Sequence, residues 1–359
     1  MPIQTPVPAP TSSFSIDFDK IFRRLLIFIL MGVAGNLIFS FLTTDDDIFT
    51  SVISFSLPYF FLALLLTWIP WFLNTFRVLI WTRFLGYNIP FLRVMKIVIG
   101  TEMGAAVSPT SVGGSPVKAG MLIQEGLSPG EAASLATFGA VEDFGFYLFF
   151  LLVIFPVGLA RYSMWDFGLW DAAKAKIVSP LSLYVLLGVL VIVFVLTVFK
   201  RKVINPKLKT QRTSVLARFA RKAAIAWDEF KYVYRLVARR GKLWYVLTTF
   251  ITGIQWICRY SVITALVLSL GLPADPLRFL ILQWFVFLSM NFVPLPGASG
   301  GAEAIFFIIY KPFLPAEAIG LITAGWRFLT FYFLLILDIF VFAGLLHLTS
   351  KPVSSEPTS

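Results

Sequence analysis

Two stretches of the sequence combine backbone and side chains that could bind an anion. Residues 100–120 read GTEMGAAVSPTSVGGSPVKAG, and residues 291–306 read NFVPLPGASGGAEAIF. Each contains a proline break, a Gly-Gly pair and then small residues with one charge, Lys118 in the first and Glu303 in the second. A helix that starts after such a pair points unpaired N–H groups and its positive dipole end toward the break. The two breaks therefore predict sites for a phosphate or another anionic group.

Charged side chains also occur inside or beside long apolar segments. A charge at the centre of a membrane helix costs roughly 2.5 to 3.5 kcal/mol on insertion scales, so such side chains should face the interior of a bundle. The residues concerned are Glu102, Glu142, Asp143, Glu303, Arg327 and Asp338. They can serve a substrate there, or form buried ion pairs that only hold helices together. The sequence leaves both interpretations open.

One short motif points to an enzyme instead. Gly297-Ala298-Ser299-Gly300 matches the G-x-S-G pattern of rhomboid intramembrane proteases, and His347 follows it in the order that a Ser/His dyad needs. His347 is expected near the membrane edge and Ser299 at depth, which disfavours contact between them. A transferase acting on polyprenyl-phosphate-linked substrates is a second enzymatic alternative. The single Cys258 and single His347 leave no Cys/His metal site, so we predict no metal and no cofactor.

Composition sets the class of protein that must position these residues. Of 359 residues, 58% are hydrophobic and 14% are charged, which is typical of multi-span membrane proteins. Runs of roughly 20 apolar residues can cross the hydrocarbon core. We predict spans near 21–42, 52–73, 135–158, 181–199, 244–270, 278–293 and 317–346. The expected fold class is an all-α polytopic membrane bundle with two re-entrant broken-helix hairpins.

Basic residues orient these spans. Basic residues flank the start of the first span, and acidic residues follow its end. They are Lys20, Arg23 and Arg24, and then Asp45, Asp46 and Asp47. By the positive-inside rule, this predicts a cytoplasmic N-terminus. A short loop on the same side is expected to hold Arg77, Arg83, Arg93 and Lys96. Segment 200–242 has fourteen Lys or Arg and two acidic residues, a net charge of +12 against +11 for the whole chain. We therefore predict that 200–242 is a basic cytoplasmic loop.

Apolar residues recur at three- and four-residue steps within this basic loop. They are Leu216, Phe219, Ala223, Trp227, Phe230, Val233 and Val237. The spacing predicts an amphipathic helix on the inner membrane surface. It either marks topology alone or recognises anionic lipid. A nucleic-acid partner is not expected, because the membrane already supplies an anionic surface.

The two breaks also share a plan, which suggests a diverged internal repeat. Three predicted spans separate them, 135–158, 181–199 and 244–270, and an odd number of crossings turns the second unit upside down. The arrangement predicts an inverted repeat, in which broken helices of transporters meet at a substrate site near the midplane. Freed backbone must be buried in protein or line a wet cavity, and Ser and Thr hydroxyls can supply replacement hydrogen bonds. The alternative is that the breaks are ordinary loops at the membrane surface.

Three motifs carry a resemblance to a known family. They are the Pro/Gly-rich first break, EGLSPGEAASLATFGAVED at 125–143 and PLPGASGGAEA at 294–304. Over roughly 20–348 the chain resembles the flippase-like family typified by the transmembrane domain of bacterial lysylphosphatidylglycerol synthetases. The late P-x-P-G-x-x-G-x-x-E pattern is met by Pro294, Pro296, Gly297, Gly300 and Glu303, with an extra Gly301. Family members typically carry a Glu-Arg pair followed by an acid where this chain has Glu142-Asp143, so the arginine is missing.

The resemblance implies lipid translocation or handling without lysyl transfer. The chain ends shortly after its last span, so the soluble aminoacyl-transfer domain of the full synthetases is expected to be absent. The predicted organisation is a disordered cytoplasmic tail over 1–19, a flippase-like transmembrane domain over 20–348 and a C-terminal tail over 349–359. The expected location is the bacterial cytoplasmic (inner) membrane, with multiple passes.

We therefore expect a non-enzymatic flippase or flippase-like transporter that moves phospholipid or polyprenyl-linked head groups between leaflets. Its partners would be membrane lipids, anionic or aminoacylated phospholipids above all, and a homodimer is left open. Lys118 and Arg327 should contact phosphate, while Glu102, Glu142 and Glu303 balance them or bind a cationic head group. The full predicted substrate-binding set is Glu102, Ser108, Pro109, Thr110, Gly113, Gly114, Ser115, Lys118, Glu142, Asp143, Asn291, Pro294, Pro296, Gly297, Gly300, Gly301, Glu303 and Arg327. No nucleotide-binding motif is apparent, so uphill transport would need an ion gradient.

Overall fold

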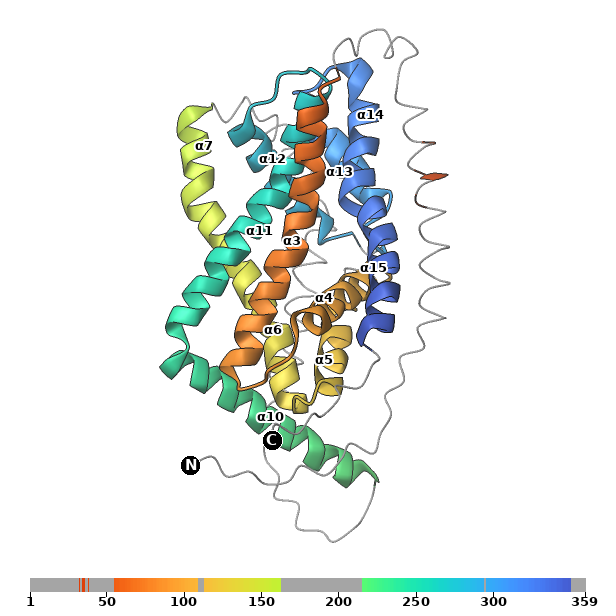
Figure 1. The fold of residues 1–359 in the computed structure, drawn as a ribbon. Helices are drawn as coiled ribbons and strands as arrows, with labels where there is room; N and C mark the ends of the chain where they lie inside the picture. The colour runs from red at the N-terminus through yellow and green to blue at the C-terminus, as the bar shows by residue number, and fades with distance from the viewer. Residues whose placement is uncertain are drawn as a thin grey trace, which may run out of the picture.

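A computed structural model describes residues 55–108, 113–162, 215–293 and 295–349, and four single residues near the N-terminus, 32, 34, 35 and 38. Two groups of helices follow the same order in this part of the chain (Figure 1). Almost all of the predicted span 21–42, and all of 181–199, lie outside the described residues, as do the tail 1–19 and residues 350–359. The all-α membrane bundle is confirmed.

Each group consists of a long helix, two short helices and a final long helix with a π-helical turn. The first group is α3 (Leu57–Phe84), α4 (Phe91–Ala106), α5 (Gly114–Gln124), α6 (Pro129–Phe149), the π-helical turn η1 (Phe150–Ile154) and α7 (Phe155–Arg161). The second is α11 (Lys242–Ser269), α12 (Pro276–Met290), α13 (Gly301–Tyr310), α14 (Ala316–Arg327), η3 (Phe328–Tyr332) and α15 (Phe333–Thr349). The amphipathic α10 (Val215–Arg240) precedes the second group.

The two 28-residue helices α3 and α11 pack along each other in opposite directions. Just before α3 begins, the Ser56 N–H donates to the Ser269 carbonyl at the end of α11, at 2.7 Å. At the other end, Phe84 of α3 lies beside Gly241, the residue before α11. The short helices that follow α3 and α11 therefore enter the bundle from opposite ends.

Each pair of short helices folds back toward the end from which it entered. At the base of the α4–α5 hairpin, Arg93 Nη1 lies 3.4 Å from Glu125 Oε2. At the base of the α12–α13 hairpin, the Tyr310 hydroxyl donates to the Phe279 carbonyl at 3.1 Å. Both hairpins thus reach into the bundle and return. Their relation as a re-entrant inverted repeat in a bilayer stays a prediction.

The short helices are too short to cross a membrane individually. They have 16, 11, 15 and 10 residues, which at a rise of about 1.5 Å per residue gives roughly 15 to 24 Å against about 30 Å of hydrocarbon. The prediction of a full span at 278–293 was therefore wrong, because that segment is one arm of a hairpin. Four helices in the described part are long and apolar enough to cross: Leu57–Phe84, Pro129–Gly158, Lys242–Ser269 and Ala316–Leu346.

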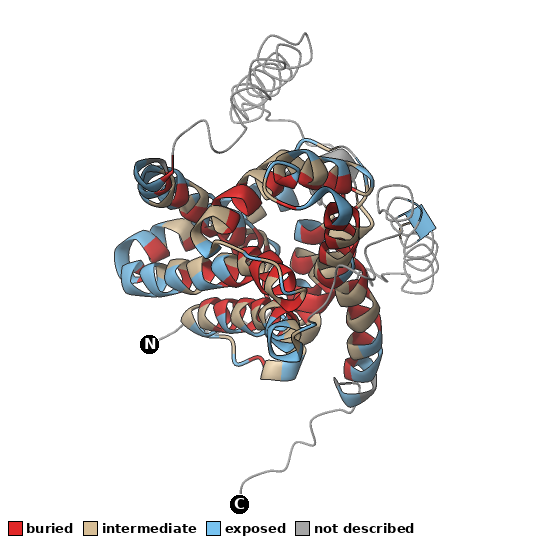
Figure 2. Cartoon of the chain, turned by 90° about the horizontal axis from the view of Figure 1, so that it is seen from above, coloured by how far each residue is buried: buried red, intermediate tan, exposed pale blue. Residues whose placement is uncertain are grey.

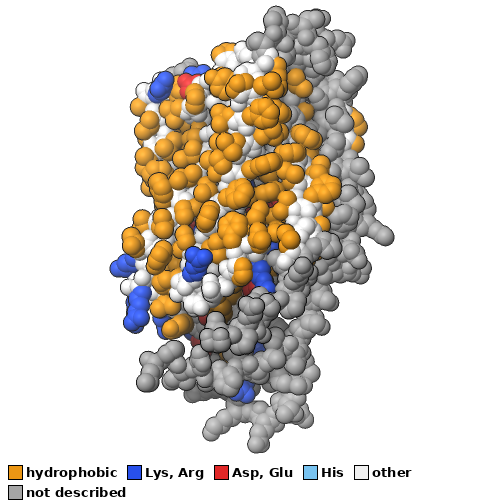
Figure 3. All heavy atoms as spheres, viewed as in Figure 1, with side chains coloured by type: hydrophobic (Ala, Val, Ile, Leu, Met, Phe, Trp, Pro, Cys, Tyr) orange, Lys and Arg blue, Asp and Glu red, His pale blue; other side chains and the backbone are white. Residues whose placement is uncertain are grey.

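The surface of the bundle is that of a membrane protein. Hydrophobic side chains cover the face seen in Figure 3, while Lys and Arg side chains lie toward its two ends. Seen from above, buried residues face the middle of the bundle and exposed ones lie on its outer faces (Figure 2). Exposed large side chains such as Phe61, Phe144 and Phe250 can face lipid at no cost.

The predicted basic loop after residue 73 was wrong. Helix α3 continues to Phe84, so Arg77 lies within it and is only 5% exposed, while Arg93 and Lys96 belong to α4. A hydropathy window ends a span at the first arginine, but the helix continues because Arg77 is buried against acids from another helix.

Helix α10 crosses the lower end of the bundle in Figure 1 and packs on the start of α6. The Gly130 N–H donates to Glu229 Oε2 at 3.0 Å, and Val233 and Val237 are buried. Trp227 and Ile225 remain exposed, as membrane-facing side chains of an amphipathic helix would be. Its cytoplasmic location stays a prediction.

Cysteine accessibility tests the opposite entry of the two hairpins. Asn88 lies in the α3–α4 connection, Lys311 follows α13, and both are exposed. In a Cys258→Ala background, a membrane-impermeant maleimide should label Lys311→Cys in intact cells, and Asn88→Cys only after the membrane is opened. Labelling of both from the same side would contradict the inverted arrangement.

Candidate functional site

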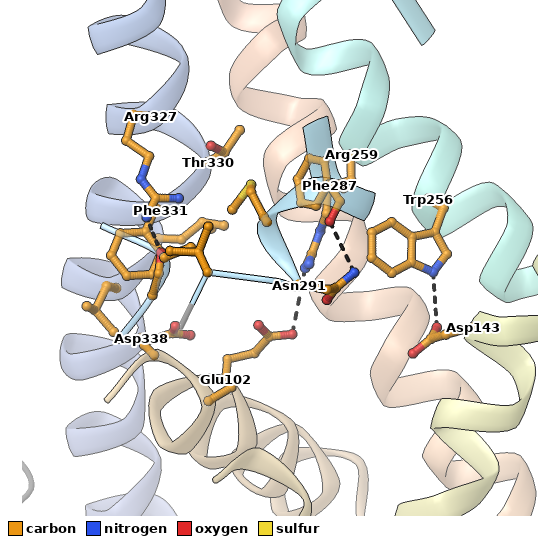
Figure 4. A pocket seen from close by; sticks show the side chains of 18 of the residues that line it. Glu102, Asp143, Trp256, Arg259, Phe287, Asn291, Arg327, Thr330, Phe331 and Asp338 are labelled. Carbon is orange, nitrogen blue, oxygen red and sulfur yellow. Dashed lines mark hydrogen bonds and ion pairs between the residues drawn. The ribbon is translucent and has the colours of Figure 1, made fainter. Parts of the chain in front are cut away.

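A cavity of about 560 Å³ lies where the two hairpins meet (Figure 4). This volume is within the range of about 300 to 1,000 Å³ typical of ligand sites. The first hairpin contributes the end of α4, and the second contributes the end of α12 and the break that follows. The remaining wall comes from α3, α6, α11 and the α14–η3–α15 helix. Its charged residues are Glu102, Asp143, Arg259, Arg327 and Asp338.

One side of the cavity is organised around Arg259 of α11. Its Nη2 lies 3.7 Å from Glu102 Oε1 of α4, and its guanidinium lies over the Trp256 ring, 5.5 Å from the ring centroid. Trp256 in turn donates its indole N–H to Asp143 of α6 at 3.0 Å. The first hairpin, α6 and α11 are thus joined by polar contacts that run along the cavity wall (Figure 4).

The opposite side is organised around Arg327, at the end of α14. Its Nε donates to Glu303 Oε1 of α13 at 3.1 Å, and its Nη2 donates to the Gly297 carbonyl in the second break. The guanidinium also lies over the Phe331 ring at 4.1 Å. Gly297 has φ +57°, and a β-carbon there would collide with the Phe331 ring. Glycine is therefore required for this carbonyl to reach Arg327.

A second ionic cluster is buried behind Asp143. Arg77 Nε lies 3.4 Å from Glu142 Oε2, and its Nη1 lies 3.4 Å from Asp143 Oδ1. Glu142 is fully buried and accepts a hydrogen bond from Trp81 Nε1 at 2.8 Å. Thr252 and Asn74 accept from the same guanidinium at 2.8 and 3.1 Å. Glu142 and Asp143 thus form ion pairs with an arginine of α3.

Lys118 is buried, but it does not line the cavity. It is 7% exposed, and no ion pair within 4 Å connects it to another described residue. Its Nζ and the Arg77 guanidinium both lie against Gly139 of α6, 3.8 and 3.5 Å from where a β-carbon would stand. Lys118 therefore adds positive charge to the buried cluster beside Glu142 and Asp143.

At the first break, the hydroxyl of Ser108 forms hydrogen bonds with the backbone. The Ser108 hydroxyl accepts from the Gly113 N–H at 2.7 Å and donates to the Ala105 carbonyl at 3.1 Å. A β-carbon on Gly113 would meet the Gly104 carbonyl at 2.6 Å, and one on Gly114 would meet the Thr101 carbonyl at 3.0 Å. These glycines let α4 and α5 approach closely.

The structure divides the predicted site residues into three sets. Glu102, Asp143, Asn291, Gly297 and Arg327 line the cavity. A second set supports the hairpins and the buried cluster without lining it: Ser108, Gly113, Gly114, Ser115, Lys118, Glu142, Pro296, Gly300, Gly301 and Glu303. Pro109, Thr110 and Pro294 lie outside the described residues. A direct substrate contact from any of them stays a prediction.

Sequence reasoning missed Arg259 and did not assign Asp338 to the site. Arg259 stands in the middle of the predicted span 244–270, so the cost of a charge in hydrocarbon was the signal that could have found it. Trp71, Trp256 and Thr330 also line the cavity. No sequence signal separates them from ordinary residues of membrane helices.

The proposed Ser299/His347 dyad cannot form. Arg327 contacts Gly297, two residues before Ser299. His347 follows Arg327 by 20 residues on one continuous helical run, which places it roughly 30 Å further along the axis. Backbone positions so far apart rule out a hydrogen bond between the two residues.

The family model for the lysylphosphatidylglycerol synthase transmembrane region matches residues 21–337, which include both hairpins and nearly all of the cavity wall. The chain belongs to this family. The resemblance predicted from the motifs is thereby confirmed. The chain is also similar to a UPF0104 membrane protein of Archaeoglobus fulgidus, at 24% identity over 274 residues, 73% of this chain and 79% of the relative.

Membership of the lysylphosphatidylglycerol synthase transmembrane-region family makes the protein a multi-pass membrane protein of a family connected with lipid handling. The family match ends at residue 337, so Asp338 lies one residue beyond it. Among the described residues, no group of three or more Cys, His, Asp or Glu is placed to hold a metal ion.

Removing a partner from the buried ionic cluster should destabilise the protein. Glu142→Gln removes one of the negative charges that balance the buried Arg77. This should lower the free energy of unfolding by on the order of 3 kcal/mol. Thermal unfolding in detergent should show a clearly lower midpoint temperature for this variant than for the parent. Asp228→Asn, whose side chain is 74% exposed, should change stability by no more than about 0.5 kcal/mol. Equal stability of both variants would mean that the cluster contributes nothing.

Proposed function

We propose that this protein moves lipid head groups between the leaflets of its membrane. The observation that carries the proposal is the cavity in Figure 4, whose wall combines hairpins from opposite ends with two arginines and three acids. A phospholipid crosses a bilayer slowly because its charged head group must leave water. A polar cavity in the protein lowers that barrier by replacing the lost hydration.

Arg259 is the residue best placed to bind the phosphate. Its side chain is 23% exposed, and its acidic partner among the described residues, Glu102, is 3.7 Å away, so an incoming phosphate can displace the carboxylate. Arg327 is already bound by Glu303 and the Gly297 carbonyl and is 2% exposed. Lys118 does not line the cavity. The predicted phosphate contacts of Lys118 and Arg327 are therefore reassigned in this proposal to Arg259.

The acidic residues of the cavity wall indicate which kind of lipid head group the cavity can bind. With Glu102, Asp143 and Asp338 against two arginines, the cavity suits a head group that pairs its phosphate with neutral or cationic groups. Anionic glycerophospholipids and their aminoacylated forms are the proposed substrates. Polyprenyl-linked lipids present the same phosphate chemistry and are the comparison class.

The acyl chains stay in the bilayer during this movement. Phe144 lines the cavity and is 69% exposed, so the cavity reaches the lipid-facing surface beside it. In the proposed cycle, one helix group rocks against the other along the packed α3–α11 pair. The head group is thereby exposed to each leaflet in turn.

A reconstituted flipping assay tests the proposal. In liposomes with fluorescent phosphatidylglycerol, the protein should accelerate reduction of inner-leaflet label by an external quencher, without ATP. Arg259→Gln should slow flipping at least about tenfold, because loss of a charge-assisted contact costs roughly 1.5 to 3 kcal/mol. Arg83→Gln, at an exposed position on α3, should stay within about twofold of the parent. If neither phosphatidylglycerol nor a polyprenyl phosphate is flipped by the parent, the proposal is wrong.

The enzymatic alternatives predict different results. Ser299→Ala should keep the parent's flipping rate within about twofold, and a fluorophosphonate probe should not label Ser299. Labelling of Ser299, or turnover of a polyprenyl-phosphate-linked donor by purified protein, would instead show an enzyme.

A further inference from the structure

The cavity contains one carboxylate that its surroundings leave unpaired. Asp338 of α15 is 3% exposed and lines the cavity, and its Oδ1 has no hydrogen-bond partner in the described structure. The buried acids Glu142 and Glu303 also leave one oxygen each without a hydrogen bond, but Glu142 is bound by Arg77 and Trp81, and Glu303 by Arg327. Among the described residues, no hydrogen bond or ion pair joins the Asp338 side chain to another side chain. Asp338 is therefore a titratable group that neither the packing nor the proposed phosphate contact uses.

Two charged groups from neighbouring helices act on Asp338. Glu102 of α4 and Arg259 of α11 are its electrostatic partners, and Figure 4 shows Glu102 and Asp338 on the same side of the cavity. Arg259 pairs with Glu102. On its own helical run, Arg327 lies eleven residues before Asp338, roughly 16 Å away along the axis, and is bound to Glu303. One available guanidinium thus faces two carboxyl groups.

A buried carboxylate without a partner costs several kcal/mol, and a bound proton would remove that cost. A metal cation is a poor alternative, because Na⁺ and divalent ions need several oxygen ligands. Among the residues that line the cavity, Glu102 is the acid that acts on Asp338, while the lining residues nearest in sequence, Leu334 and Leu335, offer no side-chain oxygen. A proton needs a single oxygen.

We propose that Asp338 carries a proton together with the lipid, so that transport is coupled to a proton gradient. When Asp338 is protonated, Glu102 is the one carboxylate that competes with phosphate for Arg259. When Asp338 is ionised, two carboxylates neutralise that guanidinium and repel the phosphate. Phosphate binding and protonation of Asp338 therefore favour each other, as linkage requires. One anionic lipid and one proton move together, and no net charge crosses.

This inference rests on the proposed flipping activity, and one experiment separates the two. Proteoliposomes with fluorescent phosphatidylglycerol are first assayed without a gradient, which tests flipping alone. A stable pH difference of one unit is then imposed, and the distribution of label between leaflets is measured at steady state. The parent should enrich the lipid in the leaflet facing the alkaline solution, by up to about tenfold per pH unit for one proton per lipid. A protonophore should abolish the enrichment, and protein-free vesicles give the background.

Three variants assign the effect to Asp338. Asp338→Asn cannot release a proton, so its leaflet ratio should stay near one. Asp338→Glu keeps a carboxyl group and should retain enrichment, and Glu317→Gln removes an exposed acid from the same helical run and should behave like the parent. A parent that flips lipid with a ratio of one under the gradient would overturn the coupling and leave flipping intact. Enrichment retained in Asp338→Asn would overturn the assignment, and absence of flipping in the parent would overturn both proposals.

Discussion

The architecture depends on the cost of leaving a peptide carbonyl or N–H unpaired inside hydrocarbon, which is several kcal/mol for each group. Both hairpins end helices within the bundle, so both must satisfy the freed groups with protein. In the first break the Ser108 hydroxyl accepts from the Gly113 N–H. In the second, Arg327 binds the Gly297 carbonyl while its charge is balanced by Glu303. A serine hydroxyl is thus used in the first break, and a buried arginine with a glycine of positive φ in the second.

The same constraint places charge where a head group can use it. Once hairpins from opposite ends meet, the space between them is bounded by polar helix ends and by the side chains that satisfy them. Arg259 and Glu102 pair across this space without being buried completely, with side-chain exposures of 23% and 32%. The Arg77 cluster behind them is buried, and its ion pairs hold α3 and α6 of the first group together. The protein therefore has one rigid ionic cluster and one that a ligand can open.

Local patterns in the sequence were sufficient for the two breaks, because proline and paired glycines interrupt an apolar segment wherever they occur. They were not sufficient for α12, the first arm of the second hairpin, which was predicted as a full span. The pairing of charges was not predictable in the same way. Arg77 and Glu142 are 65 positions apart in the chain, and Arg259 and Glu102 are 157 apart, so only the packing of α3, α4, α6 and α11 brings them together. The same lack of packing information explains why α3 was ended too early and why Lys118 was assigned to phosphate. Arg259 was missed for another reason. The cost of a charge within an apolar span, which identified Arg327, applies to Arg259 equally.

Photo-crosslinking can show whether a lipid head group enters the space between the hairpins. A phospholipid with a photoactivatable group on its head is incorporated with the protein into liposomes, irradiated, and the modified peptides are mapped by mass spectrometry. We expect labels on both hairpins within the cavity wall, in Glu102–Ala106 and in Phe287–Asn291, and we expect unlabelled phosphatidylglycerol to compete with the labelling. Labels confined to lipid-facing residues such as Phe61 and Phe250, with none in the cavity, would contradict it.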